Sequence, residues 1–166
     1  MTLETLLEER GEDTALIPLL IEDYRAEYQP ISVELAATYP GMAELLSSLT
    51  GHVRLGVVTS KPLVYTVPIL NALGFASMFE TIEGPDLSEI EAKSVTMARA
   101  LTRLTSTNEI NAVTMIGDRH HDIEAGAEHS ATTIGVTWGF GSREELIEAG
   151  ADYIVDHPDE ILTILR

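Results

Sequence analysis

The residues best suited to chemistry are two aspartates that follow a short apolar segment. Residues 113–116 are mostly apolar, Gly117 comes next, and Asp118 and Asp122 follow, four residues apart. The apolar run predicts a buried parallel strand, and the glycine predicts a sharp turn into a closely packed helix. Two carboxylates at the carboxyl end of such a strand suit Mg²⁺, which binds oxygen ligands. The alternative is that Asp118 only caps the helix and that Asp122 is solvated.

Two further positions suit a phosphoryl group. Thr59 and Ser60 follow the apolar residues 55–58, which predicts a hydroxyl and free backbone N–H groups at another strand end. The alternative is an ordinary Ser/Thr turn into a helix. Lys93 is the only lysine after Lys61, and it falls early on a predicted helix. A solvated lysine is the default interpretation, but lysine is scarce in this chain, which gives its position more weight.

Composition narrows the class of protein. The 166 residues, 45% of them hydrophobic, are enough for about one domain with a real core. The absence of cysteine excludes disulfides and thiolate metal sites, and we expect a cytoplasmic protein. No apolar run approaches the roughly 20 residues of a membrane-spanning helix. The formal charge of −17 argues against nucleic acid and anionic membranes as partners, whereas a metal and a local lysine would still admit a small anionic substrate.

The elements that position these residues alternate between helices and strands. Two amphipathic helices broken near Gly11 are expected over residues 2–28, followed by a linker over residues 30–39. Helices are then expected over 42–49, 62–73, 88–104, 122–129, 142–149 and 158–165, and strands over 52–59, 79–83, 112–117, 132–136 and 153–155. This alternation predicts an α/β fold, a doubly wound parallel sheet with helices on both faces.

Taken in order, these motifs resemble those of a known enzyme family. Thr59 at a strand end, Lys93 on a later helix and Asp118 with Asp122 at the next strand end resemble the second, third and fourth motifs of the haloacid dehalogenase superfamily of phosphatases. Several further stretches resemble its phosphoglycolate phosphatase branch, namely Pro40-Gly41 and residues 59–62, 135–146 and 149–156.

The resemblance implies a role for each of these residues. Thr59 and the Ser60 amide would hold the phosphoryl group, and Lys93 would neutralise both that group and the attacking nucleophile. Asp118 and Asp122 would organise Mg²⁺, so Lys93 and Asp118 would serve catalysis. The implied substrate is a small phosphate monoester such as 2-phosphoglycolate.

One family motif does not occur in the sequence. The nucleophile of the family is the first Asp of an Asp-x-Asp pair that closes the first strand, and the second Asp is its general acid and base. This sequence contains no Asp-x-Asp. By the resemblance, residues 1–38 form part of a helical cap and residues 39–166 form a core that lacks its first strand. We therefore expect the chain to be inactive alone.

The missing strand would also leave two strand edges unpaired at the centre of the sheet. Each buried unpaired backbone group costs about 1 to 3 kcal/mol. We therefore expect either a distorted sheet or self-association, with a homo-oligomer compensating for the gap.

Alternative functions and lesser residues complete the expectations. A catalytically dead module that binds Mg²⁺ or phosphate, or another protein, stays open. A response-regulator receiver domain is disfavoured, because its acidic pair would precede the threonine. Among lesser residues, His120 and His121 are expected to face solvent, and Trp138 either to wall the pocket or to pack beneath a loop. An ion pair of Arg143 with Glu144 or Glu148 and a helix cap by Asp156 are also expected.

Overall fold

The structure is a computed structural model that describes residues 3–87, 90–105 and 112–165, and it divides into two units, residues 1–36 and residues 37–166. None of the helices in these ranges is long and apolar enough to cross a membrane.

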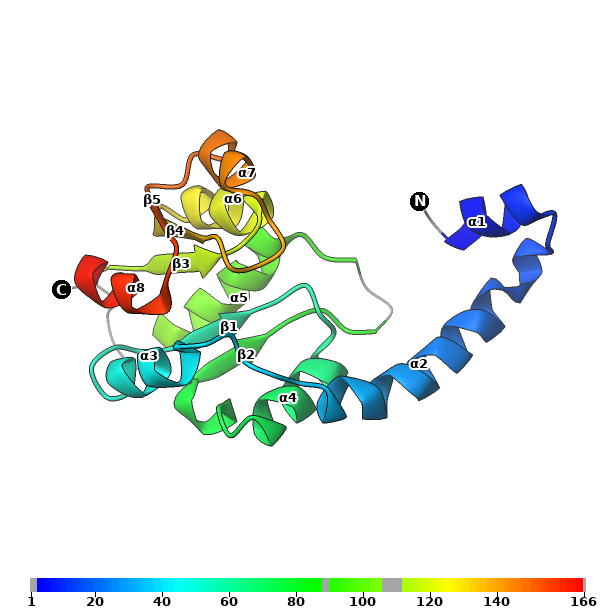
Figure 1. The fold of residues 1–166 in the computed structure, drawn as a ribbon, viewed down its shortest axis with the longest axis horizontal. Coiled ribbons are helices and arrows are strands. Elements are labelled where there is room, and N and C mark those ends of the chain that lie inside the picture. Colours follow the sequence, from blue (N-terminus) through cyan, green and yellow to red (C-terminus); the bar gives the residue numbers. More distant parts are fainter. Residues whose placement is uncertain (1–2, 88–89, 106–111, 166) are drawn as a thin grey trace. The chain divides into compact units, whose positions relative to one another are not determined.

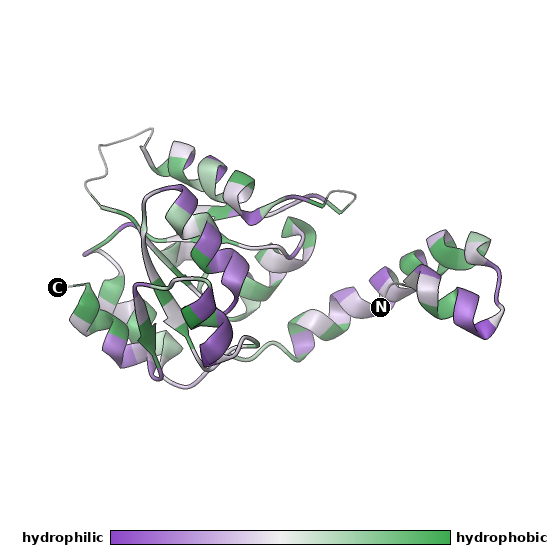
Figure 2. Cartoon of the chain, turned by 90° about the horizontal axis from the view of Figure 1, so that it is seen from above, coloured by the Kyte–Doolittle hydropathy of each residue, from purple (hydrophilic) through white to green (hydrophobic). Residues whose placement is uncertain are grey.

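The first unit is helical, as predicted. It contains α1 (Leu3–Arg10), a 3-10 turn (Thr14–Leu16) that Asp13 caps, and α2 (Ile17–Glu34). Hydrophobic and hydrophilic residues are interspersed around these helices (Figure 2), and α2 contains no buried residue.

The linker predicted from residue 30 is wrong in its first part, because α2 continues through Pro30 to Glu34. A proline inside a helix removes one backbone hydrogen bond. Two hydrogen bonds are nevertheless present in the last turns. The Ser32 side-chain hydroxyl donates to the Gln29 carbonyl at 2.9 Å, and the Leu35 backbone N–H donates to the Ile31 carbonyl at 2.9 Å.

The second unit alternates helices and parallel strands, which confirms the predicted α/β class (Figure 1). Its helices are α3 (Met42–Leu49), α4 (Leu63–Ala72), α5 (Lys93–Thr105), α6 (His120–Glu128), α7 (Arg143–Glu148) and α8 (Pro158–Ile164). Its strands are β1 (Gly56–Val58), β2 (Thr81–Glu83), β3 (Thr114–Gly117), β4 (Thr132–Val136) and β5 (Tyr153–Val155).

Two element boundaries differ from the prediction in a way that matters for the site. The strand expected over 52–59 is reduced to β1, residues 56–58. The helix expected over 88–104 begins only at Lys93, residues 88–89 lying outside the described ranges. Residues 90–92 are not helical, and the Glu91 carboxylate instead accepts a hydrogen bond from the Thr96 hydroxyl at 2.5 Å. Lys93 is therefore the first helical residue.

The parallel strands form two sheets, and the break falls between β1 and β3. β1 pairs with β2, and β3, β4 and β5 pair in that order, with Gly117 opposite Gly135 at the carboxyl end. Within the described ranges β1 and β3 do not pair with each other. Each therefore has one edge whose backbone groups meet no neighbouring strand.

The two sheets share the helix α5. Met97 of α5 forms a buried core with Met115 of β3, and Val58 of β1 packs against the same core. α5 also lies against β2 and α6, and Figure 1 shows it beside both sheets. The carboxyl ends of β1 and β3 are therefore held in one layer without a direct hydrogen bond between them.

A second core covers the opposite face of the three-stranded sheet. Its buried residues come from α3, β4, β5 and α8, and they are Leu45, Leu49, Ile134, Val136, Val155 and Ile161. Ile134 is fully buried, and burial of a side chain of this size stabilises the fold by about 1.5 to 3 kcal/mol. The sheet thus has helices on both faces, as the sequence predicts.

Candidate functional site

The site is built where β3 turns into α6. Gly117 ends the strand, and a Cβ added to it would lie 2.1 Å from the Cβ of Asp122. Only glycine leaves the room for the Asp122 side chain to fold back against the strand end. This close approach brings Asp122 next to the backbone of Asp118.

Asp122 is 3% exposed, and both of its carboxylate oxygens have partners. Oδ2 accepts hydrogen bonds from the N–H groups of Asp118 and Arg119, both at 3.1 Å. Oδ1 pairs with Nζ of Lys93, and the Lys93 side chain is only 12% exposed. Asp122 therefore fixes the turn after β3 and carries a buried ion pair at the same time.

A network of ion pairs runs along α5, the helix that Lys93 begins. Arg99 donates to Glu91 at 2.6 Å and to Glu83 at 3.2 Å, and Arg103 pairs with Glu83 at 2.5 Å. The hydrogen bond from Arg99 and a second one from a threonine hydroxyl keep the pKa of Glu91 below its usual value. Glu83 ends β2, so this network ties the middle and the last turn of α5 to the carboxyl end of the two-stranded sheet.

The carboxylate of Asp118 is held by the loop after β4. Its Oδ2 accepts a hydrogen bond from the N–H of Phe140 at 2.6 Å. A Cβ added to Gly139 would lie 2.2 Å from the Asp118 Cβ, and one added to Gly141 would lie 1.9 Å from its carbonyl oxygen. The loop reaches Asp118 only because both flanking residues lack side chains, and the ring of Phe140 itself is 89% exposed.

Glu145 of α7 is a site residue that the sequence reasoning missed. Its Oε1 accepts hydrogen bonds from the His120 N–H at 2.9 Å and from Arg119 Nε at 2.8 Å, and it lies 2.7 Å from Nδ1 of His120. These bonds, led by the backbone N–H, lower the pKa of Glu145 to about 2. Three consecutive backbone N–H groups, at residues 118, 119 and 120, are therefore bonded to carboxylates.

A signal for Glu145 exists in the sequence. Ser142 followed by Glu145 fits the capping-box pattern, in which the glutamate reaches back to the start of its own helix. Here the Ser142 hydroxyl does cap α7, accepting from the Glu145 N–H at 3.1 Å. The Glu145 side chain instead crosses to α6, a contact over 25 positions that local spacing does not reveal.

The structure brings together Lys93, Asp118 and Asp122, but it does not join Thr59 and Ser60 to them. Thr59 lies at the end of β1, in the other sheet, where its hydroxyl accepts from the Lys61 N–H at 3.0 Å. Ser60 is exposed. In the ranges that the structure describes, no hydrogen bond connects Thr59 or Ser60 with the other three residues.

Most of the sequence matches a family model. The model of haloacid dehalogenase-like hydrolases matches residues 1–136. The chain belongs to this family.

Three curated relatives of this haloacid dehalogenase-like chain differ in their named activities. It is 34% identical over 136 residues to the tyrosine-protein kinase PtkA of Mycobacterium tuberculosis, covering 81% of this chain and 46% of PtkA. It is 30% identical to the N-acetylmuramic acid 6-phosphate phosphatase of Pseudomonas aeruginosa, covering 92% and 68%. It is 29% identical to the phosphoglycolate phosphatase of Colwellia psychrerythraea, covering 86% and 63%. The chain thus spans about half to two thirds of these relatives.

Solved structures agree with the family. A protein from Clostridium difficile superimposes with a TM-score of 0.87 at 28% identity, covering 98% of this chain and 76% of that one. A predicted phosphatase from Clostridium acetobutylicum gives a TM-score of 0.77 at 32% identity, with coverage of 97% and 74%. The haloacid dehalogenase-like fold expected from the motifs is therefore confirmed.

The donor set at the end of β3 fits a magnesium ion held by few protein ligands. Among the described residues there is no cluster of three or more His, Asp or Glu side chains that could hold a metal. Mg²⁺ commonly binds through one or two carboxylates, with phosphate and water completing its shell. Both oxygens of Asp122 already have partners, whereas Asp118 uses only Oδ2 for its hydrogen bond. Asp118 thus keeps its second carboxylate oxygen, Oδ1, outside these hydrogen bonds.

Two lesser expectations are wrong. Arg143 pairs with Asp156 at 2.5 Å and not with Glu144 or Glu148, because Asp156 follows the adjacent strand β5. Asp156 does not cap α8: its Oδ1 accepts from the Thr137 hydroxyl at 2.6 Å, and His157 occupies the cap position. The Thr137 and Arg143 hydrogen bonds lower the pKa of Asp156.

The aromatic side chains near the site are also settled. His120 and His121 are partly exposed, the His120 side chain to 45%, and their ring centroids lie 4.6 Å apart in an edge-on contact. His120 is turned toward Glu145, for the reason given above. Trp138 packs against the core formed by α3, β4, β5 and α8, which supports the packing alternative.

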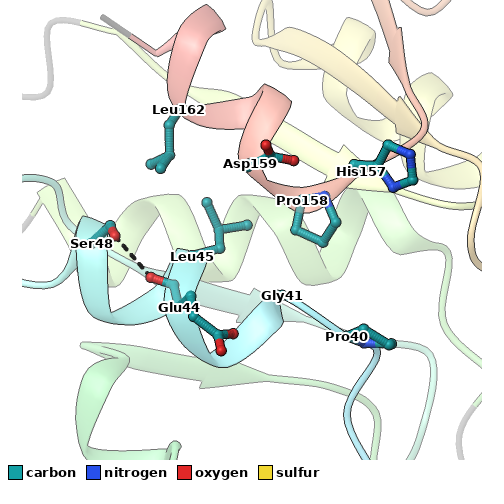
Figure 3. Close-up of a pocket in the computed structure, with 9 residues that line it drawn as sticks. All are labelled: Pro40, Gly41, Glu44, Leu45, Ser48, His157, Pro158, Asp159 and Leu162. Carbon is teal, nitrogen blue, oxygen red and sulfur yellow. Dashed lines mark hydrogen bonds between the residues drawn. The ribbon is translucent and has the colours of Figure 1, made fainter.

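A pocket lies elsewhere, between α3 and α8 (Figure 3). It is lined by Pro40, Gly41, Glu44, Leu45, Ser48, His157, Pro158, Asp159 and Leu162. None of the five predicted site residues is among them.

Proposed function

We propose that this chain carries the phosphoryl- and Mg²⁺-binding part of a phosphatase for small phosphate monoesters, with 2-phosphoglycolate as the model substrate. The observation that carries the proposal is the buried Lys93–Asp122 pair at the carboxyl end of a parallel strand, where Asp122 also accepts a hydrogen bond from the Asp118 N–H. A lysine and a metal ion together reverse the sign of the field inside an acidic protein, which a phosphate ester needs in order to bind. The phosphatases among the relatives support the same reading.

Each residue has a role that its contacts allow. Lys93 neutralises the negative charge of the phosphoryl oxygens, and Asp122 keeps its ammonium group oriented. Asp118 would hold Mg²⁺, which supplies further charge neutralisation when bound. The N–H groups of residues 118 to 120 are already bonded to carboxylates, so they leave no donor for the phosphoryl group. We therefore assign that task to Thr59 and the Ser60 N–H, in the turn after β1.

We propose further that the chain does not turn over substrate alone. Residues 1–166 contain no Asp-x-Asp pair. A carboxylate nucleophile is what forms the covalent phosphoryl intermediate in this family. The unpaired edges of β1 and β3 suit an added strand, from a second copy or another chain, that pairs with both. We place this function in the cytoplasm, in keeping with the absence of cysteine.

Turnover and binding should be measured separately. With Mg²⁺ present, we expect no hydrolysis of p-nitrophenyl phosphate or 2-phosphoglycolate, but we expect calorimetry to detect binding of inorganic phosphate. Lys93→Met should abolish that binding, whereas Glu144→Ala, which changes an exposed glutamate, should leave it intact. Hydrolysis at the rate of a full-length relative would overturn the proposed inactivity. A failure of the wild-type chain to bind phosphate would overturn the proposed site.

The state of association is tested by sedimentation. A stable monomer at micromolar concentration, with slow amide exchange along both β1 and β3, would contradict the proposal that a partner strand completes the sheet. If phosphate binds without turnover even after a partner is found, the chain is a binding or interaction module of the same fold.

A further inference from the structure

Glu145, which lies on α7, forms hydrogen bonds with the residues that follow Asp118 at the start of α6. Its single oxygen Oε1 receives three groups of residues 119 and 120: a backbone N–H, a guanidinium N–H and an imidazole nitrogen. The side chain of Glu145 is 25% exposed and that of Arg119 is 39% exposed, so the contact is partly shielded from water. A carboxylate with several convergent donors has a well-defined orientation.

The opposite side of the same segment is braced by Asp122. Asp122 Oδ2 accepts hydrogen bonds from the N–H groups of residues 118 and 119. Together, the carboxylates of Asp122 and Glu145 therefore bind three consecutive backbone N–H groups. Asp118 is the first residue of this segment, and its own Oδ2 accepts a hydrogen bond from the Phe140 N–H. The orientation of the Asp118 carboxylate therefore depends on a backbone that Glu145 helps to fix.

The loop and α7 form one connected unit. Phe140, whose N–H holds Asp118, and Ser142, which caps α7, are separated by Gly141 alone. Glu145 lies in the first turn of that helix. The loop and α7 thus contact the Asp118 segment at two points, through the main chain of residue 140 and through the carboxylate of Glu145.

We propose that Glu145 is a positioning residue for Asp118: acting through Arg119 and His120, it fixes the orientation in which the Asp118 carboxylate binds Mg²⁺. This inference rests on the proposed function for its metal but not for its geometry. Groups that orient a metal-binding residue commonly change metal affinity 10- to 100-fold when they are removed.

Mg²⁺ affinity gives the first test. Trp138, the only tryptophan, lies two residues from Phe140, so its fluorescence should report Mg²⁺ titrations of the intact chain. We expect Glu145→Ala to weaken binding at least about tenfold. Glu145→Gln keeps an oxygen that accepts from the His120 N–H, and we expect its loss of affinity to stay clearly below the roughly tenfold loss of Glu145→Ala. Glu144→Ala, one position away and exposed, is the matched control and should bind as wild type does.

The amide resonance of Phe140 gives a second test that needs no metal. A short hydrogen bond to a carboxylate shifts an amide proton downfield, and the Phe140 N–H donates to Asp118 at 2.6 Å. We expect this resonance to move upfield in Glu145→Ala, to return in Glu145→Gln and to stay in place in Glu144→Ala.

The outcomes separate the two proposals. An unmoved Phe140 amide in folded Glu145→Ala overturns the positioning role, and so does an unchanged Mg²⁺ affinity. If the wild-type chain binds no Mg²⁺ while the amide moves as expected, the metal assignment of the proposed function fails and the metal-binding part of the positioning role fails with it.

Discussion

Lys93 and Asp122 form an ion pair between two helices, with side chains that are 12% and 5% exposed. Removing one partner of such a pair leaves a charge in a poorly solvated place, whereas an exposed pair would simply return to water. The pair therefore links the stability of the fold to the same residues that we assign to phosphate binding.

Lys93→Met should lower the free energy of unfolding by about 3 kcal/mol, because it leaves the Asp122 carboxylate without its cation. Asp122→Asn should cost a similar amount by leaving Lys93 unpaired. The double variant should lose clearly less than the sum of the two, since each single change already breaks the pair. Urea unfolding of the four proteins measures this coupling, and strict additivity would show that the two side chains do not interact.

Gly141→Ala should destabilise the chain by about 1 to 3 kcal/mol, the usual cost of overpacking. The new Cβ would lie 1.9 Å from the Asp118 carbonyl oxygen, so the loop must move away and release the Asp118 carboxylate. Phe140→Ala is the control, because it removes an 89% exposed ring and keeps the N–H that holds Asp118. Thermal unfolding compares the two variants, and an equal effect from both would contradict the close packing described here.

Glu145 should make stability depend on pH in the acid range. Its pKa is about 2 in the folded chain against a usual value of 4.5, so its contribution is fully present above pH 4.5 and is lost as pH falls toward 2. The difference in unfolding free energy between wild type and Glu145→Gln should therefore narrow as pH is lowered through this window. Chemical denaturation at a series of pH values measures it. A difference that stays constant below pH 4.5 would mean that Glu145 has an ordinary pKa in the folded protein.

Thr133→Val should cost about 1 to 2 kcal/mol, because the hydroxyl of this buried residue is hydrogen-bonded twice. It donates to Oδ2 of Asp152 at 2.9 Å and accepts from the Asp152 N–H at 3.0 Å, which ties β4 to the chain entering β5. Thr132→Val is the matched control on the same strand, since Thr132 is exposed. Equal unfolding midpoints for the two variants would show that the hydroxyl contributes nothing.

The parts of the fold that the sequence predicts well are those that local chemistry determines. β4 and β5 begin and end at the predicted residues, because each is a short apolar run between polar residues and turns. Asp122, at the turn after β3, pairs with Lys93 and accepts a hydrogen bond from the Asp118 N–H. For β4 and β5, a sequence pattern only a few residues long is enough to predict where the strand begins and ends.

The parts that the sequence did not predict depend on distant contacts. Glu145 reaches His120, and Arg143 reaches Asp156, across other elements, so spacing along the helix gives the wrong partner. Pro30 was expected to end a helix, yet α2 accommodates it close to its own end.

The Asp118 carboxylate accepts its hydrogen bond from the backbone N–H of residue 140 and not from the Phe140 side chain. The hydrogen bond therefore does not depend on which side chain residue 140 carries. The close approach to Asp118 instead requires glycine on either side of residue 140, at Gly139 and Gly141. A library of side chains at position 140 would consequently sample new surfaces beside the site while the carboxylate stays where it is. This makes residue 140 a natural place for divergence among related proteins, and the first position to randomise in directed evolution.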